Sequence, residues 1–162
     1  MQAPDQWHHW PVPNRASTPE TRDALAAYLD ALGVQVGTYH LFGAHLSDAM
    51  VMDRRPEGWA VFYSERGGEN SLIVHDHEAD ACADLLARLT SDDHVFFELV
   101  CGPAPSADAD EAFGSWLDRR GLTRGDLDPT DWKYDDVPWI SGPYWRRYFV
   151  RTTVARRLGK TS

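Results

Sequence analysis

The sequence has 162 residues, of which 43% are hydrophobic and 25% are charged. A chain of this length can bury roughly 70% of the surface that it exposes when unfolded, so one hydrophobic core can stabilise it without disulfides or a structural metal. These values exclude the disordered, collagen-like and membrane classes of protein. We therefore expect a single domain over residues 1–162.

The formal net charge is −9, from 25 acidic and 16 basic residues. The last 22 residues hold six of the basic residues and no acidic one, so residues 1–140 hold 10 basic against 25 acidic groups. The negative electrostatic field of such a chain repels the phosphate backbones of nucleic acids and attracts basic proteins. The charge therefore predicts a basic protein partner and no binding to nucleic acid. An acidic surface that only keeps the protein in solution is the alternative.

Aromatic residues and cysteines add two expectations. The seven Trp, six Tyr and six Phe exceed what one core of this size readily hides, and partly exposed Trp and Tyr are typical of interfaces. Cys82 and Cys101 form no Cys-x-x-Cys pair, which predicts buried free thiols in a reducing compartment. Because there is no run of 18 apolar residues and no signal-peptide pattern near Asp5, we expect a cytoplasmic protein that does not contact membranes.

The first part of the chain predicts an arm and then a helix. Residues 1–16 fit no helix or strand period, so we expect an irregular arm whose Trp7 and Trp10 pack on the domain. A helix should follow from a cap at Ser17 or Thr18 to Gly33. Its apolar residues recur at helical spacing: Leu25, Tyr28, Leu29 and Leu32.

Short strands should follow the helix in quick succession. The expected strands are Val36–Phe42, Ala49–Asp53, Trp59–Ser64 and Ser71–His75. Turn-forming residues at 54–58 and at Gly67-Gly68 separate the later ones, and such short loops predict an antiparallel meander.

The second half of the chain predicts further helices and one more strand. A helix should begin near Asp76, and another should be capped by Ser106. The segment Val95–Cys101 is apolar on both faces, which predicts a central strand. Residues 122–143 show no sustained period and are expected to be irregular, and residues 144–158 fit a helix or an edge strand, with Pro143 and Gly159 favouring the helix. The expected fold is α+β, with an antiparallel meander of about five strands and three to four helices packed on it.

Known catalytic and cofactor signatures are absent from the sequence. His75, His77, Cys82 and His94 are the best metal candidates, but the two earlier histidines straddle a strand end and Cys82 should face the core. There is no G-x-S-x-G, reactive-cysteine or phosphate-binding glycine motif. We therefore expect no metal, no cofactor and no enzymatic activity. The alternative is a small enzyme or ligand-binding protein, whose pocket would form between the sheet and the C-terminal region only on folding.

The segment Gly125–Trp139 is the leading candidate for a contact surface, and we call it the acidic-aromatic segment. Carboxylates alternating with aromatic rings can pair with arginine or lysine and stack on their side chains. The candidate partner-binding residues are Asp126, Asp128, Asp131, Trp132, Tyr134, Asp135, Asp136 and Trp139. The alternative is structural: the two Trp would pin a long loop to the core while the aspartates cap turns or pair with the C-terminal arginines. The aspartate spacing lacks the glycine and final glutamate of a calcium loop.

The segment 58–69 (GWAVFYSERGGE), with HEADAC at 77–82 and Leu85-Leu86 after it, resembles the immunity proteins of bacterial polymorphic-toxin systems. The resemblance covers roughly residues 39–90 and is to the actinobacterial type found beside necrotizing NAD-glycohydrolase toxins. It implies a small cytoplasmic inhibitor that binds a cognate toxin and occludes its active site. It transfers no contact residue, since Trp59, Tyr63 and the segment Glu65–Gly67, which match best, read as a strand and its turn.

Overall fold

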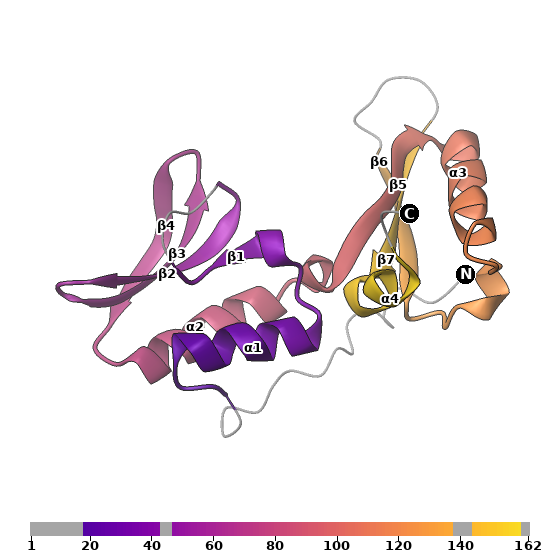
Figure 1. Cartoon of the computed structure of the whole chain (residues 1–162). Coiled ribbons are helices and arrows are strands. Elements are labelled where there is room, and N and C mark those ends of the chain that lie inside the picture. The colour runs from indigo at the N-terminus through magenta and orange to yellow at the C-terminus, as the bar shows by residue number, and fades with distance from the viewer. Residues whose placement is uncertain (1–17, 43–46, 138–143, 160–162) are drawn as a thin grey trace. The chain divides into compact units, whose positions relative to one another are not determined.

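A computed structural model describes residues 18–42, 47–137 and 144–159, and in them the fold is α+β. It has four α-helices and two sheets, one mixed with four strands and one antiparallel with three (Figure 1). The described residues divide into two compact units, the first ending at Val95 and the second beginning at Phe96. Each unit has its own sheet and its own buried residues, and we describe the two separately.

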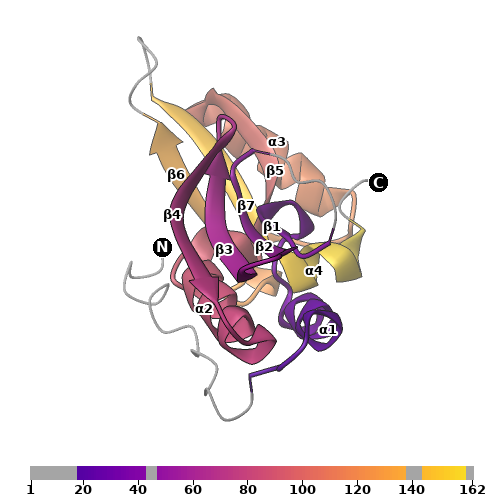
Figure 2. The same ribbon diagram turned by 90° about the vertical axis from the view of Figure 1, so that its left-hand side faces the viewer.

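The sheet of the first unit has the order β1-β2-β3-β4. Its strands are β1 (Tyr39–His40), β2 (Ala49–Arg55), β3 (Gly58–Glu65) and β4 (Gly68–His75). The last three form antiparallel hairpins, whereas β1 pairs with β2 in parallel. Figure 2 shows β4 on one border of this sheet.

Two helices complete the first unit. Helix α1 (Arg22–Leu32) is capped by Thr21 and not by Thr18, one of the two predicted caps, while the other, Ser17, lies outside the described residues. The Thr21 hydroxyl accepts from the Ala24 N–H at 3.2 Å, and the helix ends at Gly33 with φ 80°. Helix α2 (Glu78–Thr90) packs against β2, β3 and β4, and α1 packs against α2. The predicted spacing is confirmed, because the buried residues of the two helices include Leu25, Leu29, Cys82, Leu85, Leu86 and Leu89.

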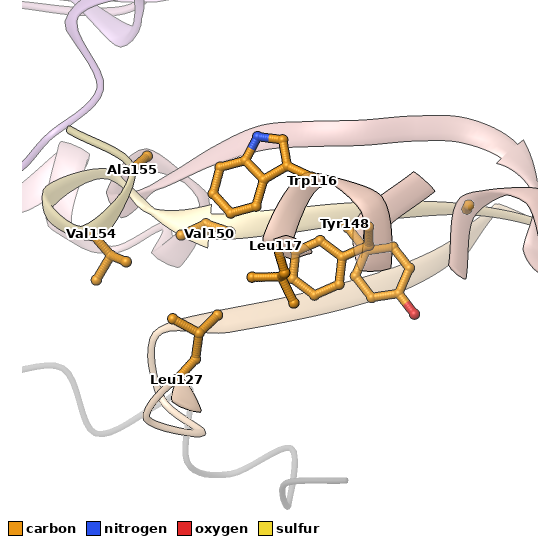
Figure 3. Packing of buried hydrophobic residues seen from close by; sticks show 9 residues of the cluster. Trp116, Leu117, Leu127, Tyr148, Val150, Val154 and Ala155 are labelled. Carbon is orange, nitrogen blue, oxygen red and sulfur yellow. The ribbon is translucent and has the colours of Figure 1, made fainter. Parts of the chain in front are cut away.

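The second unit contains the strands β5 (Phe97–Pro105), β6 (Trp132–Val137) and β7 (Trp145–Arg151), in the order β5-β7-β6. Helices α3 (Ser106–Asp118) and α4 (Thr152–Leu158) pack on β5 and β7. Figure 3 shows the core between them, where α3 and α4 contribute Trp116, Leu117, Val154 and Ala155 and the strand β7 contributes Tyr148 and Val150. The predicted cap at Ser106 is wrong, because Ser106 is the first residue of α3, and Pro105 precedes the helix without a side-chain capping hydrogen bond.

The expected single meander of about five strands is wrong, although the α+β class is confirmed. Of the predicted strand Val36–Phe42, residues Val36–Thr38 form a 3-10 helix and only Tyr39–His40 form a strand. The later strands form a second, separate sheet, in which β7 pairs with β6 directly before it and also with β5, from which a helix and β6 separate it along the chain. Short loops reveal which consecutive strands form hairpins, but they do not reveal pairings made by a strand that comes much later.

The prediction that Val95–Cys101 is a central strand is also wrong. Residues Asp93–Phe96 form a 3-10 helix, and β5 lies at the side of its sheet with β7 in the middle. Phe97 is nevertheless buried, and the Lys133 ammonium and the Arg151 guanidinium lie 4.6 and 5.1 Å from its ring centroid. Cationic side chains with long aliphatic stems can cover part of such a ring at the side of a sheet, so an apolar strand need not be a central one.

Residues 122–143 are not irregular throughout, since they contain a 3-10 helix at Arg124–Asp126 and the strand β6. Trp132 and Tyr134 alternate with Lys133 and Asp135 at the two-residue period of a strand, but Asp136 and Val137 interrupt this alternation, so the sequence pattern was too short to predict β6.

For residues 144–158 the sequence favoured a helix over an edge strand, but the helix α4 begins only at Thr152. Trp145–Arg151 form the strand β7, which lies in the middle of its sheet and not at an edge. The arm at residues 1–16 lies outside the described residues.

In the part of the chain that the structure describes, no helix is long and apolar enough to cross a membrane.

Candidate partner-binding site

The acidic-aromatic segment lies largely on one two-stranded ribbon. Trp132, Tyr134, Asp135 and Asp136 belong to β6, and Asp131 immediately precedes it. The register with β7 places Tyr134 opposite Tyr148, Asp135 opposite Arg147 and Asp136 opposite Arg146. Residues that face each other in an antiparallel pair lie on the same side of the sheet, so the ribbon brings aromatic and charged residues together in pairs.

The aromatic side chains of this ribbon pack on the core of the second unit. The Trp132 ring lies 5.6 Å from Phe113 and 6.2 Å from Tyr148, and the Tyr134 ring lies 5.5 Å from Tyr148, between ring centroids. Both side chains are partly buried. The Arg124 guanidinium lies over the Trp132 ring at 5.6 Å, and that of Arg146 lies over the Tyr134 ring at 4.1 Å. Each of these rings therefore has both an aromatic and a cationic partner within the second unit.

Three carboxylates of the ribbon form ion pairs with arginines of β7. Asp131 accepts from Arg151 at 3.1 Å, Asp135 from Arg147 at 2.7 Å and Asp136 from Arg146 at 2.8 Å. Arg146 also donates to Asp110 of α3 at 2.9 Å. Bidentate pairing of Arg147 with Asp135 fixes the planes of both groups. The acidic strand is thus matched by a basic one that the same sheet places beside it.

The two remaining aspartates cap local turns. Asp126 and Thr123 form a reciprocal capping box, in which each side chain accepts from the other residue's backbone N–H. Asp128 accepts from the Thr130 N–H at 2.9 Å and from the Thr130 hydroxyl at 2.7 Å. The backbone hydrogen bond, followed by the hydroxyl one, lowers the pKa of Asp128 and keeps this carboxylate charged.

The described part of this segment therefore has the structural role that the sequence allowed as an alternative. Trp132 packs on the core, while the aspartates cap turns or pair with C-terminal arginines. Trp139 lies outside the described residues. The role of the segment in binding a partner remains a prediction.

A polar cluster that sequence reasoning missed lies next to the ribbon. The buried Tyr148 hydroxyl donates to Asp110 at 2.6 Å and accepts from Arg124 at 2.9 Å. Burial, with the hydrogen bond to Asp110 next, raises the pKa of Tyr148. Partial burial opposes ionisation of Asp110, but the hydrogen bonds from Tyr148 and Arg146 outweigh it and lower its pKa. No spacing links residues 110, 124, 146 and 148, because folding alone brings them together.

The metal candidates do not converge among the residues that the structure describes. His75 Nε2 lies 2.8 Å from Asp84 Oδ2, and Arg88 donates to the same carboxylate. No group of three potential metal ligands forms within the described ranges. Cys82 is fully buried, and burial raises its pKa to about 11, so the thiol remains protonated at neutral pH.

A comparison with protein-family models gave no match, and neither did searches among curated proteins and among solved structures.

Proposed function

We propose that this chain is an immunity protein, which binds a basic cognate toxin and occludes its active site. The acidic sequence, the resemblance of residues 58–69 and 77–82 to immunity proteins and the partly exposed carboxylates of β6 support this function. The geometry of those carboxylates is the observation that carries the proposal, because it leaves them able to bind an additional arginine or lysine.

The carboxylates of the ribbon keep free acceptor capacity despite their intramolecular pairs. The Asp135 and Asp136 side chains are 35% and 39% exposed, and the Asp110 side chain is 42% exposed. A carboxylate has about four lone-pair sites, and a bidentate arginine occupies two of them. A toxin arginine or lysine can therefore dock on the outward lone pairs without displacing an arginine of β7.

Preorganisation is the benefit of the intramolecular pairs. Each arginine holds its aspartate in one position before the partner arrives, which lowers the conformational entropy lost on binding. Exposed pairs of this kind contribute only about 0 to 1 kcal/mol to folding, so the chain can use them for recognition at little cost in stability.

The test uses the product of the reading frame immediately upstream in the native genome, in a catalytically inactive form, as the binding partner. We expect tight binding by titration calorimetry that weakens as salt is raised, together with protection of cells expressing the active product. The variant Asp135→Asn with Asp136→Asn should bind at least about tenfold more weakly, which corresponds to about 1.4 kcal/mol.

The matched control is Glu111→Gln with Asp118→Asn, which removes the same charge from exposed positions of α3. It should bind like the unmodified chain. Equal weakening in both double variants would assign the effect to net charge and not to the ribbon. No binding and no protection by the unmodified chain would reject the immunity function.

A further inference from the structure

The strand β4 presents apolar side chains to solvent on the border of its sheet. Leu72, Ile73 and Val74 are 42%, 49% and 40% exposed. They are three consecutive residues, so both faces of the strand expose apolar side chains at this point. Single exposed apolar residues need no explanation, but a consecutive run on an edge strand forms one continuous patch.

The backbone of β4 is paired on one side only within the described part of the chain. Its inner side pairs with β3, and the sheet order ends at β4 (Figure 2). Edge strands of soluble proteins are commonly protected by a lysine, a proline or an inward-pointing charge. The segment Leu72–Val74 carries none of these, so its outer N–H and C=O groups form a template for another strand.

A β-bulge restricts that template to a short segment. The register between β3 and β4 shifts between the pairs Val61/Ile73 and Tyr63/Asn70, and Ser71 has φ 56°. A bulge bends and twists the strand locally, so regular pairing on the outer side can run only along residues 72–75. A bulge on an edge strand thus disfavours the association of long strands and leaves only a short segment able to pair.

The charges around this segment select the occupant. Residues 18–95 hold 14 acidic against five basic residues. Glu65 and Asp76 are exposed at the two ends of the segment, whereas the Glu69 carboxylate pairs with Arg55. Two copies of so acidic a unit repel each other, which disfavours a second copy as the occupant of this edge. A strand with apolar residues in its middle and basic residues at its ends has complementary charge.

We infer that β4 is a strand-addition site, at which an extended, basic-flanked segment of the partner protein pairs with residues 72–75. Main-chain hydrogen bonds supply affinity and the apolar side chains on both faces supply packing. The inference rests on the protein-binding function proposed above, but it concerns a surface on the first unit that is distinct from the β6 ribbon.

The test compares Ile73→Lys with Val36→Lys, using the inactive upstream product as the probe. Val36 is 64% exposed and lies in a 3-10 helix, so its variant controls for a lysine at an exposed apolar position of the same unit. We expect Ile73→Lys to weaken binding by at least about tenfold and Val36→Lys to leave it unchanged. In the unmodified chain, binding should slow hydrogen exchange of the amides of residues 72–75.

The outcomes separate this inference from the function on which it rests. Binding that is unaffected by Ile73→Lys, with no added amide protection at residues 72–75, would overturn strand addition while leaving the immunity function intact. No binding by the unmodified chain would overturn both. A dimer of the chain alone, by sedimentation, that Ile73→Lys dissociates would assign the edge to a second copy and also overturn the inference. Hydrogen exchange on the unmodified chain decides the question even where a variant folds poorly.

Discussion

Trp132 was predicted to bind a partner, but its side chain packs within the fold. Its ring packs against Phe113 and Tyr148 in the core of the second unit and lies beneath the Arg124 guanidinium. An exposed hot spot can be truncated with little effect on folding, whereas a packed ring leaves a cavity. Loss of binding on removing this ring would therefore not show by itself that the partner contacts it.

We predict that Trp132→Ala lowers the free energy of unfolding by about 3 kcal/mol, because a packed aromatic side chain is removed from the core. Urea unfolding followed by circular dichroism measures the change. Trp132→Phe is the control and should recover most of the lost stability, since it retains ring packing. A Trp132→Ala variant as stable as the unmodified chain would contradict the packing role.

Tyr148 gives a prediction with a pH dependence. Tyr148→Phe removes two hydrogen bonds and should cost about 1 kcal/mol near neutral pH. Because burial raises the pKa of Tyr148 above its ordinary value of 10.0, the folded state retains the phenolic proton more strongly than the unfolded state does. The stability that the phenol contributes is thus fully present below pH 10.0 and declines as pH rises above it.

Urea unfolding of both chains across this pH range provides the measurement. The stability difference between the unmodified chain and Tyr148→Phe should shrink above pH 10.0. A difference that stayed constant, or grew, would show that the hydroxyl is not held in its neutral form by the fold.

At the scale of elements, Gly58 joins β2 to β3 under a steric constraint. It has φ 146°, and a Cβ at this position would lie 2.4 Å from the backbone oxygen of His75 on β4. Gly67 in the next hairpin has φ 78°, but a Cβ at this position would have no atom of a non-adjacent residue within 4 Å. Substitutions at these two glycines can therefore distinguish the free-energy cost of the backbone conformation from that of a steric clash.

We predict that Gly58→Ala is more destabilising than Gly67→Ala. The left-handed conformation alone costs about 1 kcal/mol in Gly67→Ala, while Gly58→Ala must also move the β3–β4 ladder and should cost at least about 2 kcal/mol more. Thermal unfolding of the two variants checks the order. Equal losses would show that β4 yields at this point without cost.

The sequence predicts elements well where their neighbours in the chain decide their structure. The periods of α1, α2 and the β2–β4 hairpins are visible in short windows, and these elements are present. The second sheet depends on the pairing of β5 with β7, and these two strands are separated in the chain by the helix α3 and the strand β6. No local sequence pattern predicts a pairing over this distance. The acidic residues of the candidate site were identified, but their arginine partners were fixed only by the β6–β7 register.

At the scale of the whole molecule, net charge opposes self-association. The chain carries −9 near neutral pH, and its sequence pI is about 5.1. Mutual repulsion between chains falls as the pH approaches that value, and an apolar edge such as β4 can then associate. Charge and the exposed edge therefore act in opposite directions on solubility.

We predict a solubility minimum near pH 5, with aggregates detectable by light scattering. Ile73→Lys should reduce scattering at this pH more than Val36→Lys does, because both add one positive charge but only the first blocks the strand edge. Equal scattering by the two variants would assign the aggregation to charge alone.

The position of β7 in its sheet has a consequence for biosynthesis. The strand β7 lies between β5 and β6 in the sheet but follows both of them in the chain. Until residues after 144 have been synthesised, β5 and β6 therefore have no strand to pair with. The aspartates of β6 then also lack the arginines that balance them. The second unit can complete its sheet only after Arg151 has left the ribosome, whereas the hairpins of the first unit can already have formed.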